Sequence, residues 1–226
     1  GNGGDDVMLA SAGNDTYTFG DGLDTIDYSG LNTSISLIRG GTVNKGSLGI
    51  DTFKDFYSTI KATSGSNDWI DGLTGGGRIA SLNADLSAKS LKISGIPGIG
   101  NANFNIQNFE NIKGSDTADR IKGDSNNNIL QGNGGDDIFT SIGGKDILDG
   151  GSGNDEFTVL AADGASVTTG SGQDRIVFTS EYWKQASKDG AEAITIDDFK
   201  TGEDGDVLAL SNLFKSAIDF DGTQPV

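Results

Sequence analysis

The chain has 226 residues, a formal net charge of −17, and neither Cys nor His. This length suits one or two domains. The missing Cys and His exclude a disulfide framework, a thiol nucleophile, a Ser-His-Asp arrangement and the usual ligands of zinc. The negative charge excludes nucleic acid as a partner, and no apolar run is long enough for a membrane span. Because Gly occurs 36 times and Pro only twice, the composition favours a repeat array over a disordered linker.

Residues 1–27 carry a Gly-x-Asp-x-apolar pattern that repeats every nine residues. Its acidic positions are Asp6, Asp15 and Asp24. We expect a short roll segment here, with these three side chains projecting from tight turns as metal ligands. Since the chain starts inside a repeat and shows no signal peptide, we expect it to be a piece of a longer protein.

Residues 28–111 lose the nine-residue pattern and are predicted to form an extended β-solenoid segment. The stretches 34–38 and 89–94 alternate apolar with polar residues, which is typical of half-buried strands. We expect longer coils of the same parallel solenoid, with Asp68 as a single additional metal-binding turn. A separate small β domain inserted between two rolls is the alternative.

Residues 112–178 are predicted to form the main roll. Within it the nine-residue pattern returns at Asp119, Asp137, Asp146, Asp155 and Asp174, and a glycine precedes four of them by two residues at Gly135, Gly144, Gly153 and Gly172. We predict that these aspartates and glycines form the metal sites, because glycine-rich turns can supply backbone carbonyls as ligands. Asn128 stands at an aspartate position and should be a poor ligand. The interval of 19 residues between Asp155 and Asp174 predicts one ten-residue unit, around Asp163.

The nine-residue spacing is explained by a turn of about six residues followed by a strand of about three. Two units make a coil, so every second unit stacks at about 4.8 Å. Asp119, Asp137 and Asp155 then form one column, and Asn128 and Asp146 lie in the opposite one. Stacked carboxylates repel each other, and Ca²⁺, which takes six to eight oxygens including backbone carbonyls, would relieve the repulsion. We therefore predict several bound calcium ions.

Residues 179–226 are predicted to form a C-terminal capping segment. The stretch 180–188 is expected to be a short helix or an aromatic loop, with Tyr182 and Trp183 at the end of the roll. A solenoid end exposes strand edges and apolar side chains, and so needs a cover. The residues expected to provide it are Phe199, Leu208, Leu210, Leu213 and Phe214.

The stretches 114–123 and 131–139 resemble RTX (repeats-in-toxin) haemolysin-type calcium-binding proteins. The stretch 194–211 resembles, more loosely, the segment that closes such rolls. This resemblance implies an all-β fold, a right-handed parallel β-roll or β-helix solenoid with calcium in its turns. It also implies type I secretion, calcium-triggered folding outside the cell, and an extracellular or cell-surface location.

We therefore expect a non-catalytic, calcium-dependent structural module of a secreted cell-surface protein: a surface-layer, matrix or adhesin component. Acidic pairs such as Asp197 and Asp198 are more often ligands or solvated turns than acid–base catalysts. The alternative is a C-terminal accessory module of a secreted enzyme, such as a protease, a lipase or an alginate-modifying enzyme. Expected partners are calcium ions, other copies of the chain and cell-surface polysaccharide.

Overall fold

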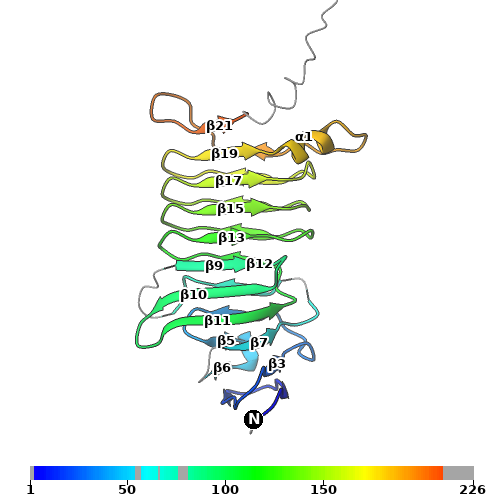
Figure 1. The fold of residues 1–226 in the computed structure, drawn as a ribbon, viewed down its shortest axis with the longest axis vertical. Helices are drawn as coiled ribbons and strands as arrows, with labels where there is room; N and C mark the ends of the chain where they lie inside the picture. The colour runs from blue at the N-terminus through cyan, green and yellow to red at the C-terminus, as the bar shows by residue number, and fades with distance from the viewer. Residues whose placement is uncertain (1–2, 54–56, 66, 76–80, 211–226) are drawn as a thin grey trace, which may run out of the picture.

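The structure is a computed structural model that describes residues 3–53, 57–65, 67–75 and 81–210. Two long, mainly parallel sheets enclose one apolar core, and their strands are stacked along the long axis of the molecule (Figure 1). The N-terminal strands lie at one end of the stack, and α1 lies near the other. The predicted β-roll architecture is confirmed.

The first sheet has eleven strands among the described residues. We call it sheet A, and it faces the viewer in Figure 1. In spatial order its strands are β1 (Val7–Leu9), β3 (Thr25–Asp27), β7 (Tyr57–Lys61), β11 (Gly100–Gln107), β10 (Ser90–Ile96), β9 (Ser81–Asp85), β13 (Arg120–Lys122), β15 (Ile138–Ser141), β17 (Glu156–Val159), β19 (Arg175–Phe178) and β21 (Val207–Ala209).

The second sheet, sheet B, has ten strands in the same part of the chain. In spatial order they are β2 (Thr16–Tyr17), β6 (Ile50–Phe53), β5 (Thr42–Asn44), β4 (Ser36–Ile38), β8 (Trp69–Asp71), β12 (Asn111–Lys113), β14 (Ile129–Gln131), β16 (Ile147–Asp149), β18 (Ser166–Thr168) and β20 (Thr195–Ile196). One short 3₁₀-helix, η1 (Gly46–Leu48), precedes β6.

The chain alternates between the two sheets along the main roll, so each coil places one strand in each sheet. Strand β15 pairs in parallel with β17 and aligns Phe139 with Phe157, a shift of 18 residues. Between β17 and β19 the shift is 19, since Phe157 aligns with Ile176. The predicted ten-residue unit near Asp163 is therefore confirmed: the additional residue is absorbed in a turn and the apolar ladder stays in register.

The core is a ladder to which each short strand contributes an inward apolar side chain. The rings of Phe139 and Phe157 stack with centroids 4.8 Å apart and planes at 8°. In the main roll the ladder consists of Ile121, Phe139, Phe157 and Ile176 from sheet A and Leu130, Leu148 and Val167 from sheet B, all fully buried or nearly so. Because neighbours along each strand point outward, three-residue strands suffice to close this core.

The middle segment departs from the parallel pattern expected of it. Its strands lie in the same two sheets, but β10 pairs antiparallel with both β9 and β11, and β5 pairs antiparallel with both β4 and β6. The reason is the length of the connections. Adjacent parallel strands need a crossover through the other sheet, whereas a short turn such as the one at Arg39–Gly41 can only join antiparallel strands.

The C-terminal end carries the predicted helix, α1 (Ser180–Ala186), whose first turn is capped by the Thr179 hydroxyl accepting from the Tyr182 N–H at 3.2 Å. Tyr182 and Trp183 pack against Phe178, with ring centroids 4.7 and 5.5 Å from it. Of the predicted capping residues, Phe199 and Leu210 pack on the core, and Leu208, though 40% exposed, is paired in register with the buried Ile176. Leu213 and Phe214 lie outside the described residues.

Candidate metal-binding edge

One edge of the roll is formed by the turns that lead into sheet A, at the left margin of Figure 1. The acidic residue just before each of the last five strands of this sheet points into that edge. We call this series column A: Asp119, Asp137, Asp155, Asp174 and Asp206. The predicted stacking of Asp119, Asp137 and Asp155 is confirmed by the strand register.

Column A is held by hydrogen bonds that run from coil to coil. In each step the carboxylate Oδ1 accepts the backbone N–H of the aspartate one coil earlier. The distances are 2.7 Å from Asp119 N to Asp137, 2.8 Å from Asp137 N to Asp155, 2.8 Å from Asp155 N to Asp174 and 3.1 Å from Asp174 N to Asp206. Each bond fixes one oxygen of the carboxylate and thereby the direction of the other.

The second oxygens of three of these carboxylates are buried and have no hydrogen-bond partner. They are Oδ2 of Asp137, Asp155 and Asp174, and each residue is at most 1% exposed. A buried carboxylate oxygen without a partner is costly and calls for an explanation such as an ion. The three orphan atoms lie at successive steps of one column, which is the position where a cation between coils would bind.

Two glycines leave open the space beside these oxygens. A Cβ placed on Gly132 would strike both Asp137 Oδ2 and the carbonyl oxygen of Gly150. A Cβ placed on Gly150 would strike Asp155 Oδ2 and the carbonyl oxygen of Thr169. Each missing side chain thus marks a cradle on which a carboxylate oxygen and a backbone carbonyl of the next coil converge, and which only a glycine keeps free.

The electrostatics of column A disfavour the charged carboxylates when no cation is present. Burial raises the pKa of Asp137 to about 8, and the charges of Asp119 and Asp155 act in the same direction. Burial likewise raises the pKa of Asp155 to about 7, and it also raises the pKa of Asp174. A bound cation would reverse this balance, because it favours the ionised form.

Asp119, at the lower end of column A, differs from its successors. Its Oδ2 accepts from the backbone N–H of Ser115 at 2.6 Å and from the Ser115 hydroxyl at 3.0 Å, and its Oδ1 accepts from Leu82 N. Its pKa is still raised by burial. The structure therefore places this predicted ligand in column A, as expected, but both of its carboxylate oxygens already accept hydrogen bonds.

The four glycines predicted in the turns have positive φ angles: 102° at Gly135, 88° at Gly144, 130° at Gly153 and 136° at Gly172. Gly153 shows why. Its φ lies in the region that side chains avoid, and a Cβ there would meet the carbonyl group of Gly135 in the coil below. These residues let successive turns approach each other and do not themselves point a side chain at a ligand.

The opposite edge holds the residues just before β8, β12, β14 and β16, which we call column B: Asp68, Glu110, Asn128 and Asp146. In the two aspartates of column B, a hydroxyl group donates a hydrogen bond to the second carboxylate oxygen. The Ser141 hydroxyl donates to Asp146 Oδ2 at 2.7 Å, and the Thr63 hydroxyl donates to Asp68 Oδ2 at 2.6 Å. Ser141 and Thr63 stand where column A has Gly132 and Gly150, five residues before the aspartate.

Asn128 interrupts column B. Its side-chain oxygen accepts from Asp124 N at 2.9 Å, and its amide nitrogen donates to the Glu110 carbonyl at 2.8 Å. Both ends of the amide are therefore used within the protein, which gives a physical reason for the prediction that Asn128 is a poor ligand. Glu110, which the repeat pattern does not mark, accepts from Asp68 N at 2.9 Å, and burial raises its pKa to about 7.

The N-terminal aspartates repeat parts of this geometry. Asp24 is 1% exposed, accepts from Asp6 N at 2.9 Å on Oδ1 and from Gly20 N at 3.2 Å on Oδ2. Asp15 is part-exposed and lies below Asp51, whose Oδ1 accepts from Asp15 N at 3.1 Å. Of the predicted ligands, the structure thus groups Asp137, Asp155 and Asp174 around orphan oxygens, and it does not do so for Asp6, Asp15, Asp24, Asp68, Asp119 or Asp146.

Sequence reasoning missed two kinds of residue at this edge. Gly132 and Gly150 form the cradles, and their place at the first position of the nine-residue unit was the signal that could have marked them. Asp206 ends column A, but it lies 32 residues beyond Asp174 with α1 between them, so spacing alone could not identify it.

Backbone oxygens must supply much of any metal coordination here. Within the described residues, no group of three or more Asp or Glu side chains is arranged to hold a metal ion. A site in column A would combine Oδ2 of Asp137 or Asp155 with carbonyl oxygens such as those of Gly150 and Thr169. Ca²⁺ accepts such mixed oxygen sets readily, whereas Mg²⁺ keeps its water and Zn²⁺ prefers Cys and His.

The stacked coils, the buried carboxylate column and the glycine cradles define a parallel β-roll with a row of carboxylates along one edge. The chain contains RTX calcium-binding nonapeptide repeats of the haemolysin type. The model of that repeat matches in four copies, over residues 1–26, 113–141 and 142–158. The matches confirm the resemblance seen in the sequence, and they include Asp137 and Asp155 but not Asp174. No curated protein matches the chain.

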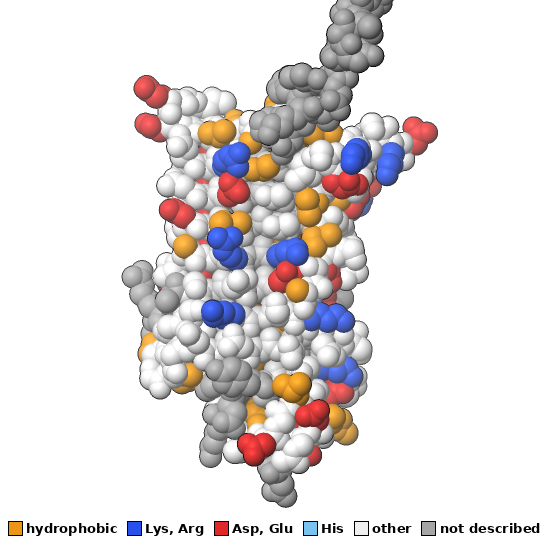
Figure 2. Space-filling view, in the orientation of Figure 1, with side chains coloured by type: hydrophobic (Ala, Val, Ile, Leu, Met, Phe, Trp, Pro, Cys, Tyr) orange, Lys and Arg blue, Asp and Glu red, His pale blue; other side chains and the backbone are white. Residues whose placement is uncertain are grey.

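Such repeats are typical of type I secreted proteins. Among the described residues, no helix is both long and apolar enough to cross a membrane. The outward side chains of sheet A are mixed in charge: Figure 2 shows Lys and Arg over the middle of this face and Asp and Glu mainly toward its margins.

Proposed function

We propose that this chain is a calcium-dependent structural module of a secreted cell-surface protein, in the role of a surface-layer, matrix or adhesin component. The single observation that carries the proposal is the row of orphan carboxylate oxygens on Asp137, Asp155 and Asp174. Without a cation these groups oppose the coil stacking that buries them. With calcium the same groups hold successive coils together.

The mechanism is folding coupled to metal binding. At the low calcium concentration inside a cell, the acidic repeats repel each other and the chain stays exportable. Outside, calcium fills the cradles beside Gly132 and Gly150, neutralises column A and closes the main roll. In this proposal the chain carries no catalytic site, and its buried carboxylates serve as ligands and hydrogen-bond acceptors.

Far-UV circular dichroism during a calcium titration tests the folding step. We expect a chelated sample to lack most of the β signal and calcium to restore it with a cooperative transition. Full native signal in excess chelator would contradict calcium-dependent folding. The surface role is tested separately, by labelling intact producing cells with antibodies against the folded chain before and after a chelator wash. Absence of labelling on intact cells would contradict it.

A further inference from the structure

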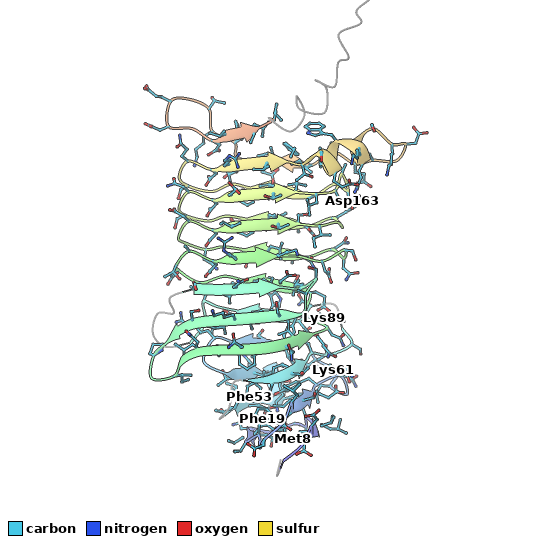
Figure 3. All side chains as sticks on the ribbon, viewed as in Figure 1. Met8, Phe19, Phe53, Lys61, Lys89 and Asp163 are labelled. Atoms are coloured by element: carbon cyan, nitrogen blue, oxygen red, sulfur yellow. The ribbon has the colours of Figure 1, made fainter. Side chains whose placement is uncertain are left out.

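A lysine is completely buried at the junction between the N-terminal repeats and the middle segment. The Lys45 side chain is 0% exposed, and it follows β5 just before η1. Burying an ammonium group is costly unless it is paired and hydrogen-bonded. Its partner is Asp51 on β6, whose side chain is also 0% exposed, and the Lys45 Nζ donates to Asp51 Oδ1. Asp51 lies on the strand that ends at Phe53, which Figure 3 shows toward the lower end of the roll.

Asp51 occupies the position in its coil that the ladder aspartates occupy in column A. Strand β2 pairs in parallel with β6 and aligns Thr16 with Thr52, so Asp15 and Asp51 are stacked neighbours. The Asp15 N–H donates to Asp51 Oδ1 at 3.1 Å. The bond from Asp137 N–H to Asp155 Oδ1, at 2.8 Å, joins the same atoms of the main roll.

The ammonium group of Lys45 is surrounded by the oxygens that a cation between two coils would take. Besides Asp51 Oδ1, its Nζ donates to the backbone carbonyl of Ser11 at 2.7 Å and lies 3.7 Å from Asp15 Oδ2. The remaining oxygen, Asp51 Oδ2, accepts from the Tyr28 hydroxyl at 3.0 Å. No oxygen of Asp51 is therefore left without a partner, in contrast to the orphan oxygens of column A.

We propose that the Lys45 ammonium is the resident cation of the Asp15–Asp51 step, so that this coil closes without calcium. The inference rests on the proposed function, because it distinguishes one metal-independent step within a calcium-dependent roll. It assigns to Lys45 the role that the repeat pattern predicts for a calcium ion at Asp15. The junction beside the middle segment then supplies a folded end on which the calcium-dependent coils can assemble.

Hydrogen exchange of the full chain, resolved to short peptides, tests this at a series of calcium concentrations. We expect the amides of 12–17 and 50–53 to stay protected at calcium concentrations at which those of 132–157 have lost their protection. Loss of protection in both regions at the same calcium concentration would overturn the proposal. The response of 132–157 reports on the proposed function by itself, because calcium-insensitive protection there would contradict calcium-dependent folding of the main roll.

Two variants and a matched control isolate the lysine. Lys45→Met keeps the length of the side chain and removes its charge, and Lys45→Ala also removes its bulk. Lys122→Met is the control, because its Nζ bonds Asp85 at 3.1 Å in a pair that is 38% exposed on the lysine side. In calcium-saturated protein we expect Lys45→Met to lower the protection of the Asp15 amide at least tenfold relative to Lys122→Met.

Equal protection in Lys45→Met and Lys122→Met would overturn the assignment. In Lys45→Ala the vacated space lies between two carboxylates and a carbonyl, so millimolar calcium should restore protection of 12–17 and add one bound ion per chain. Protection that stays lost at high calcium would show that the lysine does not stand in for a metal. Should a variant fail to fold, the calcium series on the unmodified chain still decides between the two outcomes.

Discussion

Asp137 and Asp155 are one coil apart, and the backbone N–H of Asp137 donates to Asp155 Oδ1 over 2.8 Å while Asp155 Oδ2 has no partner. One half of each carboxylate thus stabilises the coil stack directly, and the other half does so only when a cation is present. This division of roles within a single side chain separates the structural and the metal-binding contributions of column A, and substitutions can test it.

Asp155→Asn retains an Oδ1 acceptor for the Asp137 N–H and replaces the orphan oxygen by an NH₂ group. We expect the calcium concentration at the folding midpoint to rise roughly tenfold or more, because calcium affinity follows the charge and number of its ligands. Circular dichroism during calcium titration measures this midpoint. Asp204→Asn, the same change on an exposed loop, is the control, and equal midpoints for the two variants would refute a ligand role for Asp155.

Gly150→Ala fills one cradle without changing any charge. The new methyl group would meet Asp155 Oδ2 and the Thr169 carbonyl, so we expect one calcium ion fewer per chain and a loss of roughly 1–3 kcal/mol in the free energy of unfolding. Metal analysis of calcium-saturated protein and denaturant unfolding provide the two measurements. Gly40→Ala is the matched control, since a Cβ there meets nothing within 4 Å. An unchanged calcium count would show that the ion binds elsewhere.

The periodic part of this fold was predictable because its turn and strand residues recur at a fixed interval in the sequence. Aspartates nine residues apart predicted the two-sheet coil, the stacking of Asp137 on Asp155 and the ten-residue turn near Asp163. In Figure 3, Asp163 lies on the edge opposite column A, where that additional residue is absorbed. The antiparallel strands of the middle segment could not be predicted in this way, because their pairing depends on turn lengths and carries no repeat.

The repeat pattern also could not predict that carboxylate oxygens lack partners in column A but have hydroxyl partners in column B. At Asp137, Asp155 and Asp146 the difference lies in the residue five positions earlier: Gly132 and Gly150 leave a cradle open, while Ser141 fills the equivalent place with a hydroxyl. Asp174 has Thr169 at that position and still has an unpartnered Oδ2, so this residue does not decide the difference at every step. The cation position of Lys45 is likewise invisible in the sequence. Asp51 is only six residues from Lys45, but Asp15 joins the pair only when β2 and β6 meet across 36 residues.

Ser141→Ala tests the assignment of column B. The substitution leaves Asp146 Oδ2 buried without its donor, and we expect the free energy of unfolding in saturating calcium to fall by roughly 1–3 kcal/mol. Denaturant unfolding measures the change. Ser171→Ala, at an exposed turn of column A, should have little effect. If Ser141→Ala keeps full stability and binds one calcium ion more, then column B contains a metal site that the Ser141 hydroxyl normally blocks.

The pH dependence of the calcium-free chain should be opposite to that of the calcium-bound chain. In the metal-free roll burial raises the pKa of Asp137 to about 8 and that of Asp155 to about 7, whereas an unfolded aspartate has its ordinary value near 3.8. The metal-free fold therefore holds protons that the unfolded chain has released. The contribution of these two carboxylates to its stability is therefore full in acid and is lost as the pH rises from about 4 through 8.

Calcium competes with those protons, so its affinity should rise over the same interval and its binding should release protons. We expect chelated protein to show more β signal at pH 5 than at pH 8, and calcium-saturated protein to be more resistant to denaturant at pH 8 than at pH 5. A pH-stat during calcium addition at pH 7 should record acid release, and Asp137→Asn should reduce it. Proton uptake on calcium binding would contradict a metal site built on these two carboxylates.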